Sequence, residues 1–452
     1  MKKAIIVFVV VFSMVVLLGC LGLYYYTQRQ VAIREEQLAE QSAHLRETSE
    51  SEIAADASFG TDPAMAGAKA EASEPEGDEE KAAKEEASNA EEAPLARIDT
   101  DLEPIEDTGA EAGETADSGE DADMQQAETT ASAPVTLVFT GDICFHDPFA
   151  NMGAYRQRGS SIDNCIDSFL LSEMRSADIC VVNNEFPYSD RGAPLPEKTY
   201  AFRSKPENVS ILKDMGVDVA GIANNHAYDH GQEAFLDTLD ILTAAGIPYV
   251  GGGHDLAEAS SPVILEKGGM KIGILAATQI ERNWSPDTKG ATESSPGVMR
   301  CFTEEELPRF LEAIRKADSL CDFLVVFVHW GSENTDELDF RQTGQAKEFA
   351  LAGADLIVGA HPHCLQGLGI SEGVPVIYSL GNYWFNSKTV DTALLKVVVK
   401  DGRAEKVQMI PALQHDCRTD HLEGAEAQRV ISYLNSISID GAVLDENGVL
   451  IR

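Results

Sequence analysis

The sequence predicts an α/β domain over residues 134–415, preceded by a hydrophobic N-terminus and a long acidic segment. Two observations predict this class: short apolar runs alternate with stretches of helical spacing, and polar residues follow the runs where strands would end. The runs span 135–140, 179–182, 217–223, 323–328, 356–358 and 376–380, and the helical stretches span 166–174, 209–215, 234–244, 304–317 and 345–351. We therefore expect an α/β sheet with mixed strands late in the chain.

Residues 1–27 are expected to anchor the chain in a membrane. Residues 4–26 carry no charge and are long enough to cross a bilayer as one helix. Lys2 and Lys3 precede this stretch and three tyrosines close it, which favours a single-pass anchor with the rest of the chain outside the cytoplasm. The alternative is a lipoprotein attached at Cys20, because the preceding Leu-Gly resembles a cleavage box. Both alternatives place the protein at the cell membrane, facing out.

Two segments lie between the anchor and the domain. Residues 28–47 are expected to form a short juxtamembrane helix. Residues 48–133 are mainly Ala, Glu, Asp, Ser, Gly and Thr, and between 51 and 133 there are 25 acidic and 4 basic residues, or −21 of the net charge of −40. Such a segment buries too little apolar surface to offset its ordering entropy, so we expect a disordered acidic linker. Its acidity argues against nucleic acid as a partner.

The C-terminal part of the sequence is less informative. Residues 416–452 are expected to form a tail with one helix near 425–434. Seven of the eight cysteines lie after residue 134 without a C-x-x-C pair, and both disulfides and buried free thiols fit that arrangement.

Polar side chains follow six of the apolar runs. Side chains at the carboxyl ends of neighbouring strands converge, and α/β sheets bind ligands there. The motifs are Gly141-Asp142, Asn183-Asn184-Glu185, Asn224-Asn225-His226 with Asp229, His329-Trp330-Gly331-Ser332-Glu333, His361-Pro362-His363 and Gly381-Asn382. Each motif alone also fits a helix cap, a polar turn or a core histidine. Together they favour one shared site.

The residue types predict a metal centre. Carboxylates, imidazoles and an amide oxygen, without paired thiolates, suit a divalent ion such as Mn, Fe or Zn. A carboxylate can bridge two ions that clamp a phosphoryl group and activate water. We expect His226 to donate a proton to a leaving oxygen, with Asp229 orienting its imidazole. The expected ligands of one or two ions are Asp142, Glu185 as the bridge, Asn225, His329, His361 and His363.

At these residues the sequence resembles the poly-γ-glutamate capsule biosynthesis protein family, CapA, whose domain is similar to the calcineurin-like metallophosphoesterases. The matching motifs run in the family's order over about residues 135 to 385. They include Phe139-Thr140-Gly141-Asp142, Gly359-Ala360-His361-Pro362-His363 with Gln366, and Ser379-Leu380-Gly381-Asn382. The resemblance implies a metallophosphoesterase-like, two-layer β-sandwich flanked by helices. It also implies a membrane-attached protein that works outside the cell on an anionic polymer.

The resemblance also implies individual roles. The first metal carboxylate falls on Asp142, the bridging acid on Glu185, the amide ligand on Asn225, the adjacent proton donor on His226, and the later ligands on His329, His361 and His363. This sequence departs from the wider superfamily twice. An Asp-x-His motif reads Asp142-Ile143-Cys144 here, and a glutamate replaces the bridging aspartate. One metal position is therefore short of a ligand, and one or two ions both fit the pattern.

Three functions fit the sequence. The first is a metal-dependent hydrolase that acts on a phosphoester or polymer bond during synthesis, release or anchoring of a poly-γ-glutamate capsule. The second is a non-catalytic subunit that binds the anionic polymer or a membrane synthase or export complex. The third is a phosphatase for small nucleotides, with Arg203, Lys205, Arg282 and Trp284 supplying the pocket. The anchor and the long linker favour a bulky or immobile substrate, so the third ranks last.

Overall fold

A computed structural model describes residues 132–196, 198–280 and 289–451 of the chain. The expected anchor (1–27), juxtamembrane helix (28–47) and nearly all of the acidic linker (48–133) lie outside the described residues. Within the described ranges, no helix combines the length and the apolar character that a membrane crossing requires.

Two large mixed β-sheets form the centre of the domain. The eight-stranded sheet has the order β16-β15-β14-β1-β2-β3-β4 with β13 beside β1, and the six-stranded sheet has the order β11-β12-β10-β9-β7-β6. Strands β1 to β4 are parallel to one another, whereas β14, β15 and β16 are antiparallel additions. The sheets thus mix parallel and antiparallel strands, as the alternation of strands and helices predicted.

The strands have the following bounds. In the larger sheet they are β1 (Val135–Ile143), β2 (Ile179–Asn184), β3 (Val219–Gly221), β4 (Tyr249–Val250), β13 (Asn382–Trp384), β14 (Val390–Lys400), β15 (Arg403–His415) and β16 (Arg418–His421). In the smaller sheet they are β6 (Val263–Lys267), β7 (Met270–Thr278), β9 (Phe323–His329), β10 (Leu356–Ala360), β11 (Leu365–Ser371) and β12 (Val374–Leu380). A separate pair is formed by β5 (Gly252–Gly253) and β8 (Gly297–Val298).

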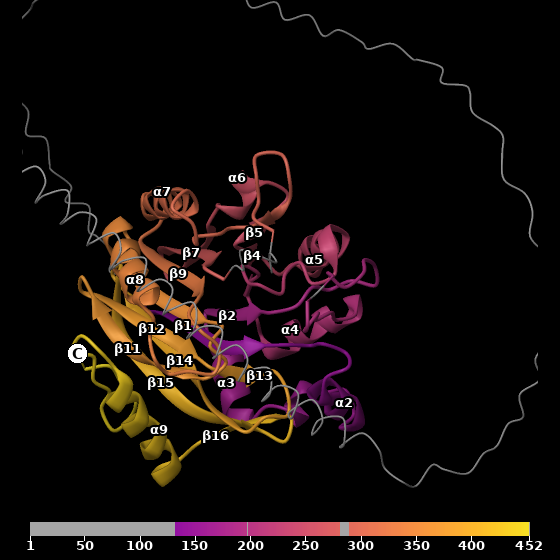
Figure 1. Cartoon of the computed structure of the whole chain (residues 1–452). Helices are drawn as coiled ribbons and strands as arrows, with labels where there is room; N and C mark the ends of the chain where they lie inside the picture. Colours follow the sequence, from indigo (N-terminus) through magenta and orange to yellow (C-terminus); the bar gives the residue numbers. More distant parts are fainter. Residues whose placement is uncertain (1–131, 197, 281–288, 452) are drawn as a thin grey trace, which may run out of the picture. The chain divides into compact units, whose positions relative to one another are not determined.

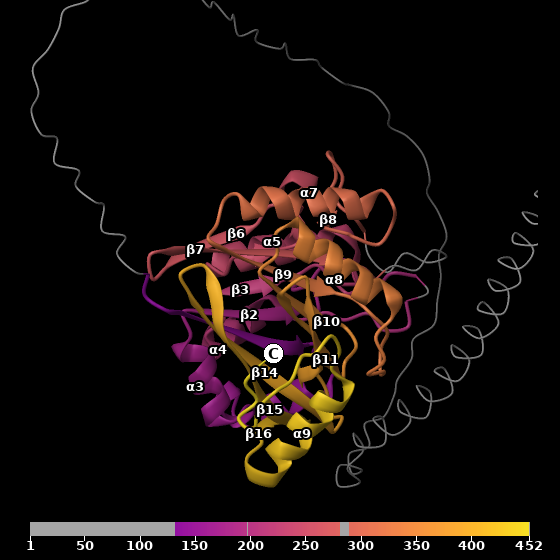
Figure 2. The ribbon, with the colours of Figure 1, turned by 90° about the vertical axis from the view of Figure 1, so that its left-hand side faces the viewer.

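Helices cover the outer faces of both sheets. The helices are α2 (Ala150–Gln157), α3 (Ser168–Ser176), α4 (Val209–Met215), α5 (Gly231–Ala245), α6 (Leu256–Ala259), α7 (Glu306–Asp318), α8 (Phe340–Ala352) and α9 (Gly424–Ile437), with short 3-10 turns at Ile162–Asn164 and Pro206–Asn208. Helices α3, α4 and α5 share a core with the larger sheet, and α7 and α8 share one with the smaller sheet. Figures 1 and 2 show α7 and α8 along the six-stranded sheet, with α4 on the other side of the domain.

The inner faces of the two sheets pack against each other. One buried cluster contains Leu137 and Phe139 of β1 together with Val325 and Phe327 of β9. The rings of Phe139 and Phe327 meet across the layers with their centroids 6.2 Å apart. Alternate residues such as Val138 point to the helical side instead. Because both faces of these strands are covered, their sequences read as continuous apolar runs.

Residues 416–451 pack onto the sandwich. Strand β16 pairs with β15, and Val430, Ile431 and Leu434 of α9 lie in the core shared by the two sheets. The seven cysteines of the described residues are free thiols, and five of them are buried. Of the two alternatives for the cysteines, the structure therefore shows free thiols at these seven positions.

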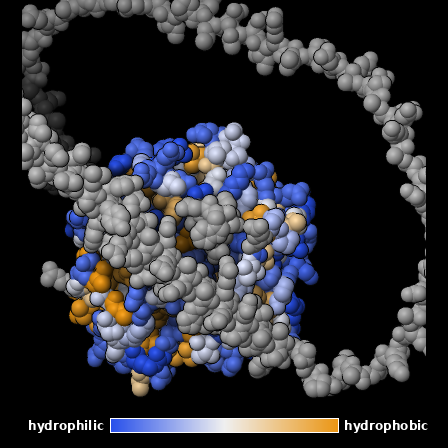
Figure 3. Space-filling view, viewed as in Figure 1, coloured by the Kyte–Doolittle hydropathy of each residue, from blue (hydrophilic) through white to orange (hydrophobic). Residues whose placement is uncertain are grey.

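Hydrophobic residues are dispersed over the described surface. On the face shown in Figure 3, the visible described residues are mainly hydrophilic, with hydrophobic ones in small areas. Among the most exposed large side chains, Phe340 and Leu351 lie at opposite ends of α8, and Ile451 lies near the C-terminus. The apolar residues are thus largely used in the three internal cores, and the polar motifs stand out at the strand ends.

Candidate metal centre

Strand β1 brings Asp142, its next-to-last residue, into the centre, and the position of Asp142 depends on Gly141. A side chain at Gly141 would meet the Gly381 carbonyl oxygen at 1.9 Å, so only glycine allows β1 to approach the turn after β12 so closely. Asp142 then donates its backbone N–H to the Gly381 oxygen over 2.8 Å. Its carboxylate is fully buried and accepts a hydrogen bond of 2.8 Å from Asn183 Nδ2. The local backbone thus fixes one carboxylate at the carboxyl end of the central strand.

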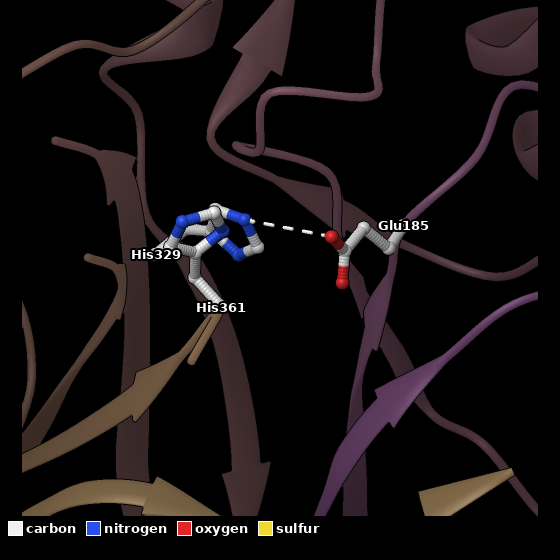
Figure 4. A group of neighbouring side chains, drawn as sticks. All are labelled: Glu185, His329 and His361. Atoms are coloured by element: carbon white, nitrogen blue, oxygen red, sulfur yellow. Dashed lines mark ion pairs between the residues drawn. The ribbon is translucent and has the colours of Figure 1, made fainter. Parts of the chain in front are cut away.

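Glu185, directly after β2, is the point where the histidines converge. Its Oε1 atom is buried and has no hydrogen-bond partner. Three imidazole nitrogens surround that oxygen: His363 Nε2 at 3.6 Å, His329 Nε2 at 3.7 Å and His226 Nε2 at 3.9 Å. Figure 4 shows His329 and His361 facing Glu185 across the site. A buried carboxylate oxygen without a donor is costly, and a cation bound among these nitrogens would compensate it.

His361 and His363 reach the centre from a strained turn after β10. Both residues have positive φ angles, 99° and 57° respectively, a region that non-glycine residues rarely adopt. Such conformations cost on the order of 1–3 kcal/mol each and persist where the surrounding structure enforces them. The His361 backbone N–H points at the Asp142 carboxylate, 3.3 Å from Oδ2. His363 Nδ1 lies 2.9 Å from Asn382 Oδ1 and 3.1 Å from Asp142 Oδ2.

Three groups of side chains in the described residues have donor atoms close enough to hold an ion. Within each group the donor atoms lie within 4.8 Å of one another, and the groups are Glu185 with His329 and His361, Asp142 with Glu185 and His363, and Glu333 with His361 and His363. Glu185 belongs to two of the groups, as expected for a bridging carboxylate. Nitrogen and oxygen donors of this kind suit a divalent transition metal. The donor set therefore fits one or two divalent ions.

The electrostatics of the centre differ between its histidines. Burial lowers the pKa of His329 well below its ordinary value, and the neighbouring imidazoles of His361 and His363 lower it further. Burial also lowers the pKa of His361 to about 4. For His363, burial again lowers the pKa, but the carboxylates of Glu185 and Asp142 outweigh it and raise the pKa to about 10. His329 and His361 thus offer neutral nitrogens, which is the state that binds a metal.

The loop after β3 supplies an amide and a hydrogen-bonded imidazole. Asn225 Oδ1 lies 2.8 Å from His329 Nε2, so this amide oxygen joins the same centre. His226 Nδ1 lies 2.7 Å from Asp229 Oδ2, and its ring stacks on Phe202 at 4.0 Å. Burial lowers the pKa of His226, and Asp229 opposes that shift. All eight residues singled out in the sequence therefore lie in one buried region.

Three further residues connect these side chains and were not singled out in the sequence. Asn183 Nδ2 donates to Asp142 Oδ1 over 2.8 Å and to Glu185 Oε2 over 3.1 Å, so it separates the two carboxylates. Asn224 Nδ2 in turn donates to Asn183 Oδ1 over 3.2 Å. Both asparagines belong to the strand-end motifs of the sequence. Their position in those motifs is the sequence signal that could have identified them as residues of the site.

Lys198 is the third of these residues. Its ammonium group donates to the Asn225 carbonyl oxygen and pairs with Asp229 Oδ1, and its side chain is 8% exposed. It comes from the loop between β2 and α4, far in sequence from Asn225, and no local pattern marks it. Of the residues suggested for a nucleotide pocket, Arg203 donates to the carbonyl oxygens of Arg191 and Gly192, while Arg282 and Trp284 lie outside the described residues.

Comparison with known proteins supports one family. A family profile described as "Bacterial capsule synthesis protein PGA_cap" matches residues 136–387, which include all eight residues. The chain is 30% identical over 302 residues to the PGA biosynthesis protein CapA of Bacillus subtilis (strain 168), covering 65% of this chain and 76% of that protein. It is 30% identical over 218 residues to the capsule biosynthesis protein CapA of Bacillus anthracis, covering 48% of this chain and 52% of that protein.

A more distant relative is named a probable polyglutamine synthesis accessory protein of Mycobacterium tuberculosis. It is 27% identical over 219 residues, covering 48% of this chain and 58% of that protein. The chain therefore spans about half the length of the second and third relatives and three-quarters of the first. The family match covers more than half of the chain and contains the whole candidate centre. This chain belongs to the bacterial capsule synthesis protein family PGA_cap, which includes the CapA proteins.

Proposed function

We propose that this chain is a membrane-anchored, extracytoplasmic hydrolase that uses a divalent metal during synthesis, release or anchoring of a poly-γ-glutamate capsule. A phosphoester or polymer bond is the proposed target. The observation that carries the proposal is Glu185 Oε1, a buried oxygen without a hydrogen-bond partner among three imidazole nitrogens. The names of the Bacillus relatives support a role in capsule synthesis.

The residues divide into those that hold the ion and those that handle the proton. Asp142, Glu185, Asn225 and the three histidines His329, His361 and His363 are the proposed ligands. A divalent ion bound there would polarise the scissile group and lower the pKa of an attacking water. The chain's own contribution is to place the imidazole rings, of which those of His329 and His361 are neutral, and two acidic side chains at fixed positions.

His226 is the proposed proton donor to the leaving oxygen. Nδ1 of that ring donates a hydrogen bond to Asp229, and Nε2 lies 3.9 Å from Glu185 Oε1, so the ring donates a proton from Nε2 when it is in the imidazolium form. Phe202 stacks on the ring and restricts its rotation. A positioned imidazole of this kind contributes about 10²–10⁴-fold to rate.

A second candidate function is a non-catalytic subunit that binds the anionic polymer or the membrane-bound synthase or export machinery. The accessory role in the name of the mycobacterial relative favours it. In that case the ion would serve to hold the turn of His361 and His363 against β1 and β2, and turnover would be absent. The nucleotide phosphatase ranks below both, because Arg203 is hydrogen-bonded to the backbone of its own loop.

Metal content decides between these functions first. The full-length protein, purified in detergent, is analysed by plasma mass spectrometry beside Glu185→Gln and His254→Ala. We expect about one or two ions per parent chain and a loss in Glu185→Gln, because Glu185 belongs to two of the three donor groups. His254 is exposed and bonded to Glu258 at 2.8 Å, so its replacement is a matched control with unchanged metal.

The loaded protein is then assayed on poly-γ-glutamate and on phosphodiester probes. Hydrolysis by the parent, lost in Glu185→Gln and kept in His254→Ala, supports the hydrolase. A folded parent without metal, even after incubation with Mn or Zn, overturns it. Metal binding without hydrolysis of either probe class leaves the polymer-binding subunit as the better function.

A further inference from the structure

The loop after β9 brings an additional carboxylate to the candidate centre. A donor oxygen of Glu333 and donor nitrogens of His361 and His363 lie within 4.8 Å of one another. Glu333 is exposed at the surface, whereas His361 is buried. It stands four residues after His329, in the motif His329-Trp330-Gly331-Ser332-Glu333, and the proposed reaction gives it no role.

The position of Glu333 is fixed by hydrogen bonds to the turn that carries the two histidines. Trp330 donates its backbone N–H to the Ala360 oxygen over 3.0 Å, and Asn334 donates its own to the Pro362 oxygen over 2.8 Å. The loop is thus tied to the segment of the histidines on both sides of Glu333. Asn334 has a φ of 56°, a conformation that this turn requires.

The side-chain amide of Gln366 also holds this loop in place. Gln366 Nε2 donates to the carbonyl oxygens of Thr335, over 3.1 Å, and Glu337, over 3.4 Å. Its own Oε1 accepts a 2.8 Å hydrogen bond from Gln342 Nε2 at the start of α8. The backbone around Glu333 is therefore ordered by contacts made on β10, β11 and α8, independently of any contact of the Glu333 carboxylate.

An unpartnered nitrogen points to a ligand at this place. His361 Nδ1 is buried and has no hydrogen-bond partner, and the residue as a whole is 4% exposed. A buried ring nitrogen without a partner is unfavourable unless something else occupies it. Two imidazoles and one carboxylate are a donor set that binds Zn and other first-row divalent ions while leaving positions open.

Two possible metal donors lie at the end of β1: Asp142 in the strand and Cys144 directly after it. Cys144 lies in the core between the larger sheet and its helices. None of the three donor groups found among the described residues contains Cys144. The strand end of β1 thus contributes Asp142 alone.

We propose that Glu333 is a metal ligand that completes, from the loop after β9, the coordination at His361 and His363. This inference rests on the proposed metal centre and extends it. Glu333 is exposed, so an ion held there would be open to solvent and to an incoming substrate. That ion is expected to exchange faster than one held by Glu185 and His329, whose donor atoms are buried.

The test is an equilibrium titration of the full-length protein with Mn²⁺, with bound metal measured after dialysis. Glu333→Gln is compared with Glu337→Gln, a matched control that removes the same charge from an exposed residue of the same loop. We expect Glu333→Gln to weaken Mn²⁺ binding by at least about tenfold at one site and Glu337→Gln to match the parent. Equal Mn²⁺ content and affinity in parent and Glu333→Gln overturn the proposal.

A second variant separates a ligand from a nearby charge. Glu333→His keeps a donor atom but has no negative charge, and nitrogen ligands suit Zn²⁺. If Glu333 is a ligand, Glu333→His retains Zn²⁺ that Glu333→Gln loses. If both variants lose Zn²⁺ equally, Glu333 acts only through its charge, and the proposal that it is a ligand is overturned. A parent that binds no metal overturns the proposed centre itself, which is a different result from any of these.

Discussion

The two sheets contribute unlike halves to the candidate centre. In the half from the larger sheet, side chains are held by other side chains: Asn183 bonds both carboxylates, and Lys198 pairs with Asp229. In the half from the smaller sheet, the backbone does this work through positive φ angles at His361 and His363. The first half is largely satisfied by its own hydrogen bonds, whereas His361 Nδ1 in the second has no partner.

This difference indicates which half depends on a bound ion to keep its geometry. A network of satisfied hydrogen bonds keeps its geometry without a ligand, so Asp229 and His226 should stay in place in the metal-free protein. A strained turn with an unpartnered nitrogen gains more from binding, because the ion supplies the missing interaction. Glu185 Oε1 is an unpartnered atom of the larger-sheet half, and it faces His329 and His363 of the other half.

The largest effect on turnover is expected when His226 is replaced. If this ring handles a proton and holds no ion, His226→Ala should lower turnover by about 10²–10⁴-fold with unchanged metal content. Turnover on the probe that the parent hydrolyses and metal by plasma mass spectrometry are measured on the same preparation. His254→Ala, which replaces an exposed histidine, is the control. Metal lost together with turnover would make His226 a ligand and would break the division into halves.

A smaller effect is expected at Lys198, which contacts Asp229 and so acts on His226 indirectly. Its ammonium group fixes the Asn225 carbonyl and Asp229, so Lys198→Met should let the Asp229–His226 pair lose its orientation. We expect turnover to fall about 10–100-fold, the usual range for a supporting residue, with metal content retained. Lys205→Met, at an exposed lysine of the same loop, is the control.

For Lys198, the pH profile tells positioning from a general loss of structure. A positioning role changes the acidic or basic limb of the kcat profile, because the environment of His226 changes. A uniform fall of kcat at every pH, with the profile otherwise unchanged, would contradict the assignment.

The sequence predicted the strand-end donors better than it predicted the contacts between them. Continuous apolar runs predict buried strands, and the polar residues that follow them, such as Asp142, Glu185 and His361, mark the strand ends at which α/β sheets bind ligands. The mixed α/β sheets and their helical cover followed from the same alternation. These features depend on short segments of the sequence, and they can therefore be predicted without knowledge of the tertiary structure.

What could not be predicted depends on tertiary structure. Lys198 has no periodic or motif signal, and only the fold brings its loop to Asn225. The same holds for Glu333. It stands four residues after His329 in the same motif, but its approach to His361 and His363 depends on hydrogen bonds between two loops. The pairing of β16 with β15 and the packing of α9 likewise depend on long-range contacts, so residues 416–452 looked like a separate tail.

The smallest predicted effect concerns the stability of the metal-free protein as a function of pH. An unfolded histidine has a pKa of about 6.5. For His361 the folded pKa is lowered to about 4, so the unfolded state binds the extra proton between those values and stability rises with pH up to about 6.5. For His363 the folded pKa is raised to about 10, so stability falls as pH rises from about 6.5 towards 10.

The two effects have opposite signs. In the presence of a chelator, the contribution of His361 and His363 to the free energy of unfolding is therefore largest near neutral pH. Urea unfolding between pH 5 and pH 9 measures it, with His363→Gln as the variant that should remove the fall on the alkaline side. A bound ion requires His363 to be unprotonated, so saturation with Mn²⁺ should also remove that fall. If the alkaline fall persists unchanged in His363→Gln, another group causes it. The histidine turn would then be no more sensitive to an ion or a proton than the hydrogen-bonded half that faces it.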